Sequence, residues 1–157
     1  MEYIGAAVGL GVLLALIGWF LWRWTHHAGR EIQVGRAREL FALQRDHLQA
    51  LFFKAAAATG KPKGLRWKNC EFGSELQLAR DKKSGELLGL LPVTIAFEAI
   101  PGSDMEGVPA VGNLRCASAV FIFHRRNWTT TGRAVFNLNP DEAIRHFHNA
   151  YDPVQKE

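Results

Sequence analysis

Residues 86–100, ELLGLLPVTIAFEAI, form the longest strand-like stretch of the chain. In its second half every other residue is apolar, and these residues are Val93, Ile95, Phe97 and Ala99. Successive side chains of a β-strand point to opposite faces, so this alternation predicts a long strand in a sheet. Pro92 has no backbone N–H to donate to a neighbouring strand, so we expect it at a sheet edge, at a bulge or at the start of the strand.

Stretches on both sides of this one also predict strands. They are 65–72 (LRWKNCEF), 75–80 (ELQLAR), 115–126 (RCASAVFIFHRR) and 128–138 (WTTTGRAVFNL). Residues 81–85 predict a turn and residues 126–127 a hairpin, whereas the prolines and glycines of 101–112 predict a long connection. Residues 120–123 are apolar on both faces, which indicates a central strand covered by a helix on at least one side.

A long amphipathic helix precedes the predicted strands, and a short helix follows them. Apolar residues near spacings of three and four in 29–60 are Val34, Ala37, Phe41, Leu48, Leu51 and Ala55. This period predicts a helix that ends at Gly60 and packs on the sheet, because Gln44 interrupts the stripe that a coiled coil would need. Residues 139–142, Asn-Pro-Asp-Glu, predict the start of the short helix.

The predicted fold class is α+β, with one N-terminal transmembrane helix, a long amphipathic helix, a mostly antiparallel sheet of about five strands and a short C-terminal helix. The expected divisions are a transmembrane anchor (1–24), a juxtamembrane amphipathic helix packed on the sheet (25–60) and a small α+β domain (61–157). The part after the anchor is long enough for one hydrophobic core and too short for two.

The N-terminal helix is predicted to cross a membrane. Residues 4–22 contain no charged side chain, and a helix needs about 20 apolar residues to span a hydrocarbon core. Glu2 is the charged residue before this stretch and bulky residues follow it, so a cleavable signal peptide is not indicated. We expect an uncleaved signal-anchor of a single-pass protein. The alternative is a buried helix of a soluble protein, which would need a large protein around it.

Aromatic and basic residues flank the predicted span. The rings that suit the headgroup level are Tyr3, Trp19, Trp22 and Trp24. The arginines that follow the span and can attract anionic headgroups are Arg23, Arg30, Arg36 and Arg38. Because basic residues favour the cytoplasmic side, we expect the cell's inner (cytoplasmic) membrane, with the N-terminus outside and the domain in the cytoplasm.

Gly5 and Gly9 form a G-x-x-x-G pattern within the predicted span. This spacing places both glycines on one helix face, where a second helix can approach closely. The pattern favours a homodimer through the transmembrane helix. An ordinary span is the alternative, because glycine is common in membrane helices.

The sequence contains no motif for catalysis, cofactor binding or metal binding. Two pairs of histidines, 26–27 and 146–148, have spacings that keep them off a shared helix face. Cys70, Cys116 and His124 would form a metal site only if the strands brought them together, and two buried thiols with a strand-end histidine are the favoured alternative. No glycine-rich phosphate loop follows a strand. We therefore expect no cofactor, no metal and no catalytic residue.

The charge distribution does not favour nucleic acid as a partner. Residues 23–54 carry six basic and three acidic side chains, whereas residues 65–157 carry eleven of each. The basic excess therefore lies beside the predicted membrane span. A nucleic-acid-binding domain would need a basic face of its own.

The leading interpretation is a non-catalytic, membrane-anchored accessory or scaffold protein whose domain binds protein partners, including a membrane protein. Met105, Val108 and Val111 place apolar side chains in the long connection, which predicts a partner loop, and the alternative is a lid folded on the sheet. A membrane-tethered small-ligand-binding module is the second interpretation, and an enzyme is the third. Polar groups converging in a pocket, such as Arg115, His124 and Glu98, would favour ligand binding.

Overall fold

The computed structural model describes residues 2–59 and 63–154, and side chains of the first helix only at 15–20 and from 33 onward. The chain divides into two compact units, residues 1–36 and residues 37–157. α1 (Glu2–Thr59) is one helix that runs through both units. The two helical segments predicted at 1–24 and 25–60 therefore belong to a single element.

The predicted membrane span lies mostly outside the described side chains. Among the residues that the structure describes, no helix combines the length and the apolar character that crossing a membrane requires. The anchor at 4–22 stays a prediction. The predicted interface and seam residues whose side chains lie outside the description are Tyr3, Gly5, Gly9, Trp22, Arg23, Trp24 and Arg30. Trp19 is described, and its side chain is exposed.

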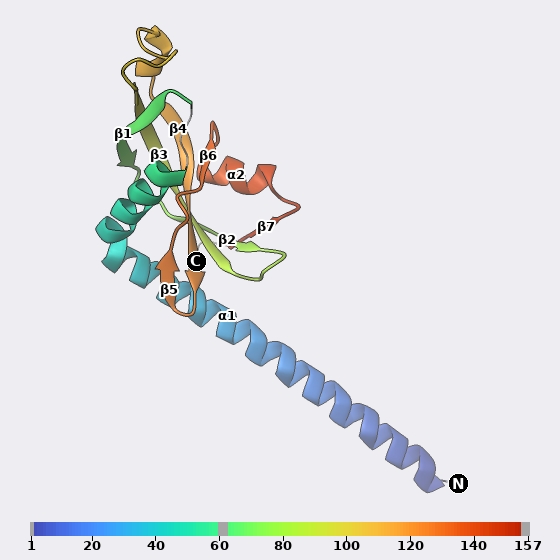
Figure 1. Cartoon of the computed structure of the whole chain (residues 1–157). Coiled ribbons are helices and arrows are strands. Elements are labelled where there is room, and N and C mark those ends of the chain that lie inside the picture. Colours follow the sequence, from blue (N-terminus) through green and yellow to red (C-terminus); the bar gives the residue numbers. More distant parts are fainter. Residues whose placement is uncertain (1, 60–62, 155–157) are drawn as a thin grey trace. The chain divides into compact units, whose positions relative to one another are not determined.

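Seven strands of the described residues form one sheet, in which every pairing is antiparallel (Figure 1). The elements after α1 are β1 (Leu65–Phe72), β2 (Gln77–Asp81), β3 (Leu87–Ala99), η1 (Pro109–Gly112), β4 (Arg115–His124), β5 (Asn127–Thr129), β6 (Ala134–Phe136), α2 (Pro140–His146) and β7 (Tyr151–Pro153). The strand order is β5-β4-β3-β2-β7, while β1 pairs with β3 and β6 pairs with β4. The predicted α+β class and mostly antiparallel sheet are confirmed.

The sheet has more strands than the five that the sequence predicts. The strand predicted at 128–138 is two strands, β5 and β6, because residues 130–133 leave the ladder between them. Thr130 Oγ1 donates to the carbonyl of Val120 across this interruption. β7 pairs with β2 and was not predicted.

Pro92 lies inside the central strand β3, so its predicted place at an edge, a bulge or a strand start is wrong. It is opposite Ser118 of β4 in the register. Its carbonyl accepts a hydrogen bond of 2.8 Å from the backbone N–H of Gly73, on the side where β1 ends before β2 begins. The backbone nitrogen and carbonyl of a strand residue point to the same side, so the missing N–H falls in this gap between partner strands.

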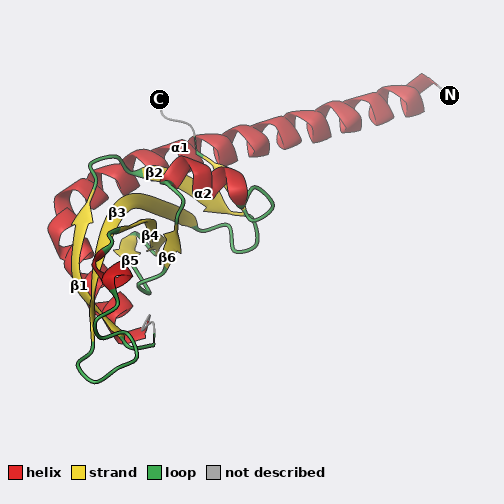
Figure 2. Ribbon diagram, turned by 90° about the horizontal axis from the view of Figure 1, so that it is seen from above, coloured by secondary structure: helices red, strands yellow, loops and turns green. Residues whose placement is uncertain are grey.

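α1 packs on one face of the sheet through one apolar stripe (Figure 2). The buried side chains are Ala37, Phe41, Leu48, Phe52 and Ala56. After Leu48 the predicted stripe contained Leu51 and Ala55, whereas the residues that are buried there are Phe52 and Ala56. A helix turns about 100° per residue, so position 52 lies close to the direction of Phe41 and position 51 lies well to one side. Gln44, which interrupts the predicted stripe, is exposed.

Aromatic rings fill the space between α1 and the sheet. Phe41 meets the rings of Phe121 and Trp128 edge-on, with centroids 5.1 and 5.2 Å apart. Phe52 lies 5.8 Å from Phe121. Each buried phenylalanine contributes about 1.5–3 kcal/mol to folding. Trp128 Nε1 also donates a hydrogen bond of 2.8 Å to the carbonyl of Ala37, which fixes the start of this helical stretch against β5.

Gly132 brings the segment between β5 and β6 into contact with the backbone of α1. A Cβ atom at this position would lie 2.3 Å from the nitrogen of Ala56 and 2.6 Å from the carbonyl carbon of Ala55. Its φ of 76° is in the left-handed region that favours glycine. The loop can therefore approach the α1 backbone at Ala55 and Ala56 only because Gly132 has no side chain.

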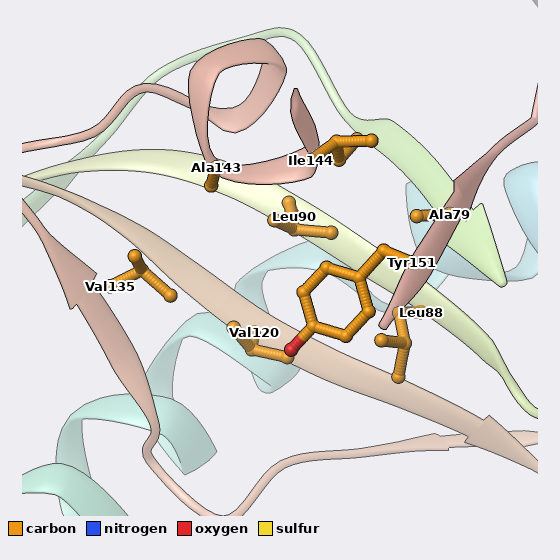
Figure 3. Packing of buried hydrophobic residues seen from close by; sticks show 8 residues of the cluster. All are labelled: Ala79, Leu88, Leu90, Val120, Val135, Ala143, Ile144 and Tyr151. Atoms are coloured by element: carbon orange, nitrogen blue, oxygen red, sulfur yellow. The ribbon is translucent and has the colours of Figure 1, made fainter. Parts of the chain in front are cut away.

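The other face of the sheet is covered by α2, and the side chain of Tyr151 in the edge strand β7 joins the core on this face. Figure 3 shows this second core, in which Tyr151 lies among residues of β2, β3, β4 and α2. Asn139 caps α2 by accepting from the N–H of Glu142, whose side chain accepts from the N–H of Asn139. The helix ends at His146, and Tyr151 belongs to β7. β4 is thus covered on both faces, as its apolar residues 120–123 predicted.

Candidate protein-interaction surface

The long connection between β3 and β4 is held to the start of β1. The carbonyl of Gly64 accepts hydrogen bonds from the backbone N–H of Ile100, at 2.9 Å, and from Ser103 Oγ, at 3.0 Å. A Cβ atom at Gly64 would meet Cγ of Met105 at 2.9 Å. Gly64 has a φ of 75°, so it serves both the turn and the close packing of Met105.

Backbone hydrogen bonds order the connection along its length. Successive turns join the carbonyls of Ile100, Ser103, Met105, Val108 and Ala110 to N–H groups three residues later. Glu106 adds a side-chain contact, because its carboxylate accepts from the N–H of Gly102 at 2.7 Å. η1 lies against β3. A connection ordered in this way loses little conformational entropy when it binds a partner.

Apolar side chains are exposed at this end of the sheet. They are Ile100 (40% exposed), Val108 (37%), Leu114 (63%) and Phe136 (42%), and we call them the loop-end surface. Ile100 and Leu114 border the connection, which extends beyond β3 and β4 in Figure 1. The ring of Phe136 lies 6.4 Å from that of Phe97, in the strand that leads into the connection. Exposed apolar side chains at one end of a domain are candidates for an interaction surface.

The predicted partner loop divides between two roles in the structure. Val108 is exposed and belongs to the loop-end surface, whereas Met105 and Val111 are half-buried. Met105 therefore holds the loop in place, in the manner of the predicted lid. The sequence pattern missed Leu114, which directly precedes a strand, and Phe136, which lies in one, because an apolar residue at such a position is ordinarily expected to be buried.

β1 leaves a free strand edge beside the loop-end surface. In the described part of the chain, β1 pairs with β3 and with no second strand. The register shifts between Trp67 and Asn69, and Lys68 at this irregularity is exposed. Bulges and lysines on an edge hinder the addition of another strand. The loop-end surface therefore suits a protein partner better than the β1 edge does.

The polar residues named as a ligand pocket do not converge. His124 Nδ1 lies 2.6 Å from a carboxylate oxygen of Glu86, at the end of the sheet opposite the connection. Glu98 is hydrogen-bonded to Arg66 at 2.7 Å. Arg115 is exposed at the start of β4, the opposite end of that strand from His124.

The two cysteines lie on opposite faces of the sheet and are free. Cys70 pairs with Ile95 and shares its face, which is the face of α1, whereas Cys116 pairs with Thr94 on the face of α2. Burial raises the pKa of the Cys70 thiol to about 11, so it stays protonated at neutral pH. His124 is remote from both, and no group of three potential metal ligands occurs among the described residues.

A shallow groove of roughly 530 Å³ lies on the α2 face beside Cys116. Its polar lining includes Glu71, Thr94, Asn137 and Asn139. These groups come from β1, β3 and the segment that leads into α2. The groove is one place in the described domain where a small ligand would find several hydrogen-bonding groups together.

Comparisons with protein-family models, with curated proteins and with solved structures found no match for this chain. The loop-end surface and the Cys116 groove differ in chemistry. The first is apolar and exposed, which suits a protein, and the second is a groove in which polar groups lie among apolar ones, which suits a small ligand.

Proposed function

We propose that this protein is a non-catalytic, single-pass membrane protein whose α+β domain binds a protein partner through the loop-end surface. The observation that carries the proposal is an ordered connection with exposed apolar side chains. Val108 and Leu114 stand on a loop that its own backbone hydrogen bonds hold in shape. A preorganised apolar surface has less entropy to lose on binding than a flexible loop has.

The membrane part of the proposal is supported by the sequence. Residues 4–22 carry no charge, and arginines follow them without any before them. We place the domain on the cytoplasmic side of the inner membrane. The chain is expected to remain in the membrane pellet after alkaline extraction, and release of the full-length chain by carbonate would contradict the anchor.

The partner surface is tested by replacing Val108 and Leu114 together with serine in the full chain. A partner cross-linked in membranes and co-purified in detergent should fall about tenfold in yield, because two anchors of the interface are lost. The unfolding midpoint should stay the same, since both side chains are exposed. Leu43→Ser is the matched control, because Leu43 is a leucine of α1 that is 76% exposed away from this surface.

A second experiment separates the partner loop from the lid. Met105→Ser should lower the free energy of unfolding by about 1–3 kcal/mol, because it removes packing against Gly64. Val108→Ser should leave stability unchanged. Equal partner yields from the wild type and the Val108/Leu114 variant would contradict the proposed surface.

The second candidate function is a membrane-tethered ligand-binding module, and the Cys116 groove favours it. Cys116→Tyr would fill the groove without entering a core, because Cys116 is exposed. If the protein binds a small polar ligand there, this variant should lose the ligand and keep the protein partner. Loss of the partner instead would assign the groove to the same interface.

A further inference from the structure

Two hairpin turns meet at the end of the sheet opposite the loop-end surface. One turn joins β2 to β3 and the other joins β4 to β5, and Figure 1 shows both at the lower end of the sheet. Leu87 and Phe123 are register partners. The residues just beyond them, Glu86 and His124, contact each other at 2.6 Å.

The β4–β5 turn consists of two arginines in an unfavourable backbone conformation. His124 and Asn127 are paired, so Arg125 and Arg126 form a two-residue hairpin turn. Their φ angles are 48° and 68°, both in the left-handed region. Asn-Gly is the pair favoured in such a turn, because side chains other than those of Gly and Asn are strained there. Strain of this kind is often retained where the side chains have a function.

Several cations lie at this end of the sheet, and Lys83 of the β2–β3 turn, like the two arginines, forms no ion pair among the described residues. Lys82 pairs with Asp152 at 3.1 Å, and Asp81 accepts hydrogen bonds from the backbone of the β2–β3 turn. Arg125 and Arg126 are exposed, and among the described residues neither forms an ion pair. Their charges are therefore free for an external anion.

The arginine turn lies where α1 enters the domain. Trp128, two residues after Arg126, donates its indole N–H to the carbonyl of Ala37, and Ala37 is the first residue of the unit 37–157. Toward the N-terminus the chain continues into the arginine-containing stretch and the uncharged residues 4–22. Within the domain, the basic turn thus lies near Ala37, the residue through which the domain connects to the N-terminal part of α1.

We propose that Arg125 and Arg126 bind anionic lipid headgroups of the membrane that holds the chain. The inference rests on the proposed membrane anchor. Guanidinium groups bind phosphate oxygens through paired hydrogen bonds, and a basic site in a domain that is tethered to a membrane meets headgroups at high local concentration. Contact at this turn leaves the loop-end surface, at the opposite end of the sheet, accessible to a protein partner.

The test uses the full chain reconstituted into vesicles, with Cys70 and Cys116 replaced by serine and a donor fluorophore on Asn127→Cys. The acceptor is carried by lipid headgroups. Energy transfer should be about twofold stronger in vesicles that contain phosphatidylglycerol than in phosphatidylcholine alone, and salt should reduce the difference. A donor on Glu106→Cys, in the connection at the other end, should show no such dependence.

The decisive variant is Arg125→Asn/Arg126→Gly, which removes both charges and gives the turn its favoured residues. The fold should be kept, and the dependence on anionic lipid should be lost. Arg125→Lys/Arg126→Lys, which keeps both positive charges, should retain part of the dependence on anionic lipid. A transfer signal that is the same in both lipids, or unchanged in the Asn-Gly variant, would overturn the inference.

Vesicle flotation distinguishes failure of this inference from failure of the anchor. If the wild-type chain floats with both lipid mixtures but shows no arginine-dependent transfer, the anchor stands and the inference is wrong. If it floats only with anionic vesicles and only with both arginines present, the turn binds lipid and the anchor is wrong. Competition by RNA in place of anionic lipid would assign the turn to another partner and overturn the inference.

Discussion

Gly132 gives the sharpest test of how α1 is attached to the sheet. Gly132→Ala places a methyl group 2.3 Å from the nitrogen of Ala56, a separation that requires the loop or the helix to move. The left-handed φ of 76° adds strain for any residue with a side chain. We expect about 1–2 kcal/mol from the backbone conformation and a further ~1–3 kcal/mol from overpacking.

Gly85→Ala is the matched control, because it isolates the backbone contribution. Gly85 has a φ of 75°, and nothing lies within 4 Å of a Cβ atom built there. Urea unfolding of the full chain in detergent, followed by tryptophan fluorescence, should show a loss of about 1–2 kcal/mol for this variant. Gly132→Ala should lose more. Equal losses for the two variants would refute the close contact between the β5–β6 segment and α1.

Four further predictions concern the domain. Cys116 should react with iodoacetamide at pH 8 faster than Cys70 in peptide mass spectrometry, because Cys116 is exposed and Cys70 has a raised pKa. Since the folded state keeps the Cys70 thiol protonated up to a pKa of about 11, stability should fall as the pH rises from about 9 toward that value, and Cys70→Ala should remove this dependence. Asn139→Ala should lower the free energy of unfolding in urea by about 0.5–2 kcal/mol, because the α2 cap is lost. Trp128→Phe should lower it by about 0.5–1.5 kcal/mol, because the hydrogen bond to Ala37 is lost. An unchanged free energy of unfolding in either variant would contradict the corresponding contact.

Local patterns predicted the elements that short-range chemistry determines. The cap at Asn139, the alternation in β3 and the apolar residues 120–123 each depend on neighbours within a few positions, and the structure has the elements that they predicted. Pro92 was misplaced because its tolerance depends on where two other strands, β1 and β2, end and begin. Such a gap between partners is a property of the sheet and leaves no mark in the sequence beside the proline.

The candidate surfaces were harder to predict from the sequence, because they too depend on the tertiary arrangement. Val108 was identified because an apolar residue in a loop is locally unusual, whereas Phe136 lies in a strand and is exposed only because its neighbours leave it uncovered. Arg125 and Arg126 read as ordinary turn residues until their φ angles are known. Tertiary context determines both exposure and backbone strain. The loop-end surface is recognised by the exposure of its side chains, and the arginine turn by its strained backbone.

The two surfaces should act independently because α1 and the sheet hold them apart. α1 enters the domain at Ala37 beside Trp128 and ends at Thr59, shortly before Gly64 contacts the connection. A helix of that length measures roughly 33 Å, and energetic effects of substitutions add when the sites are this far apart. Substitution of the arginine turn should therefore change lipid contact without changing partner yield, and the Val108/Leu114 variant should do the reverse. A loss of partner yield on Arg125→Asn/Arg126→Gly would mean that lipid contact orients the domain for its partner. Binding of lipid at one surface and of the partner at the other would then be coupled.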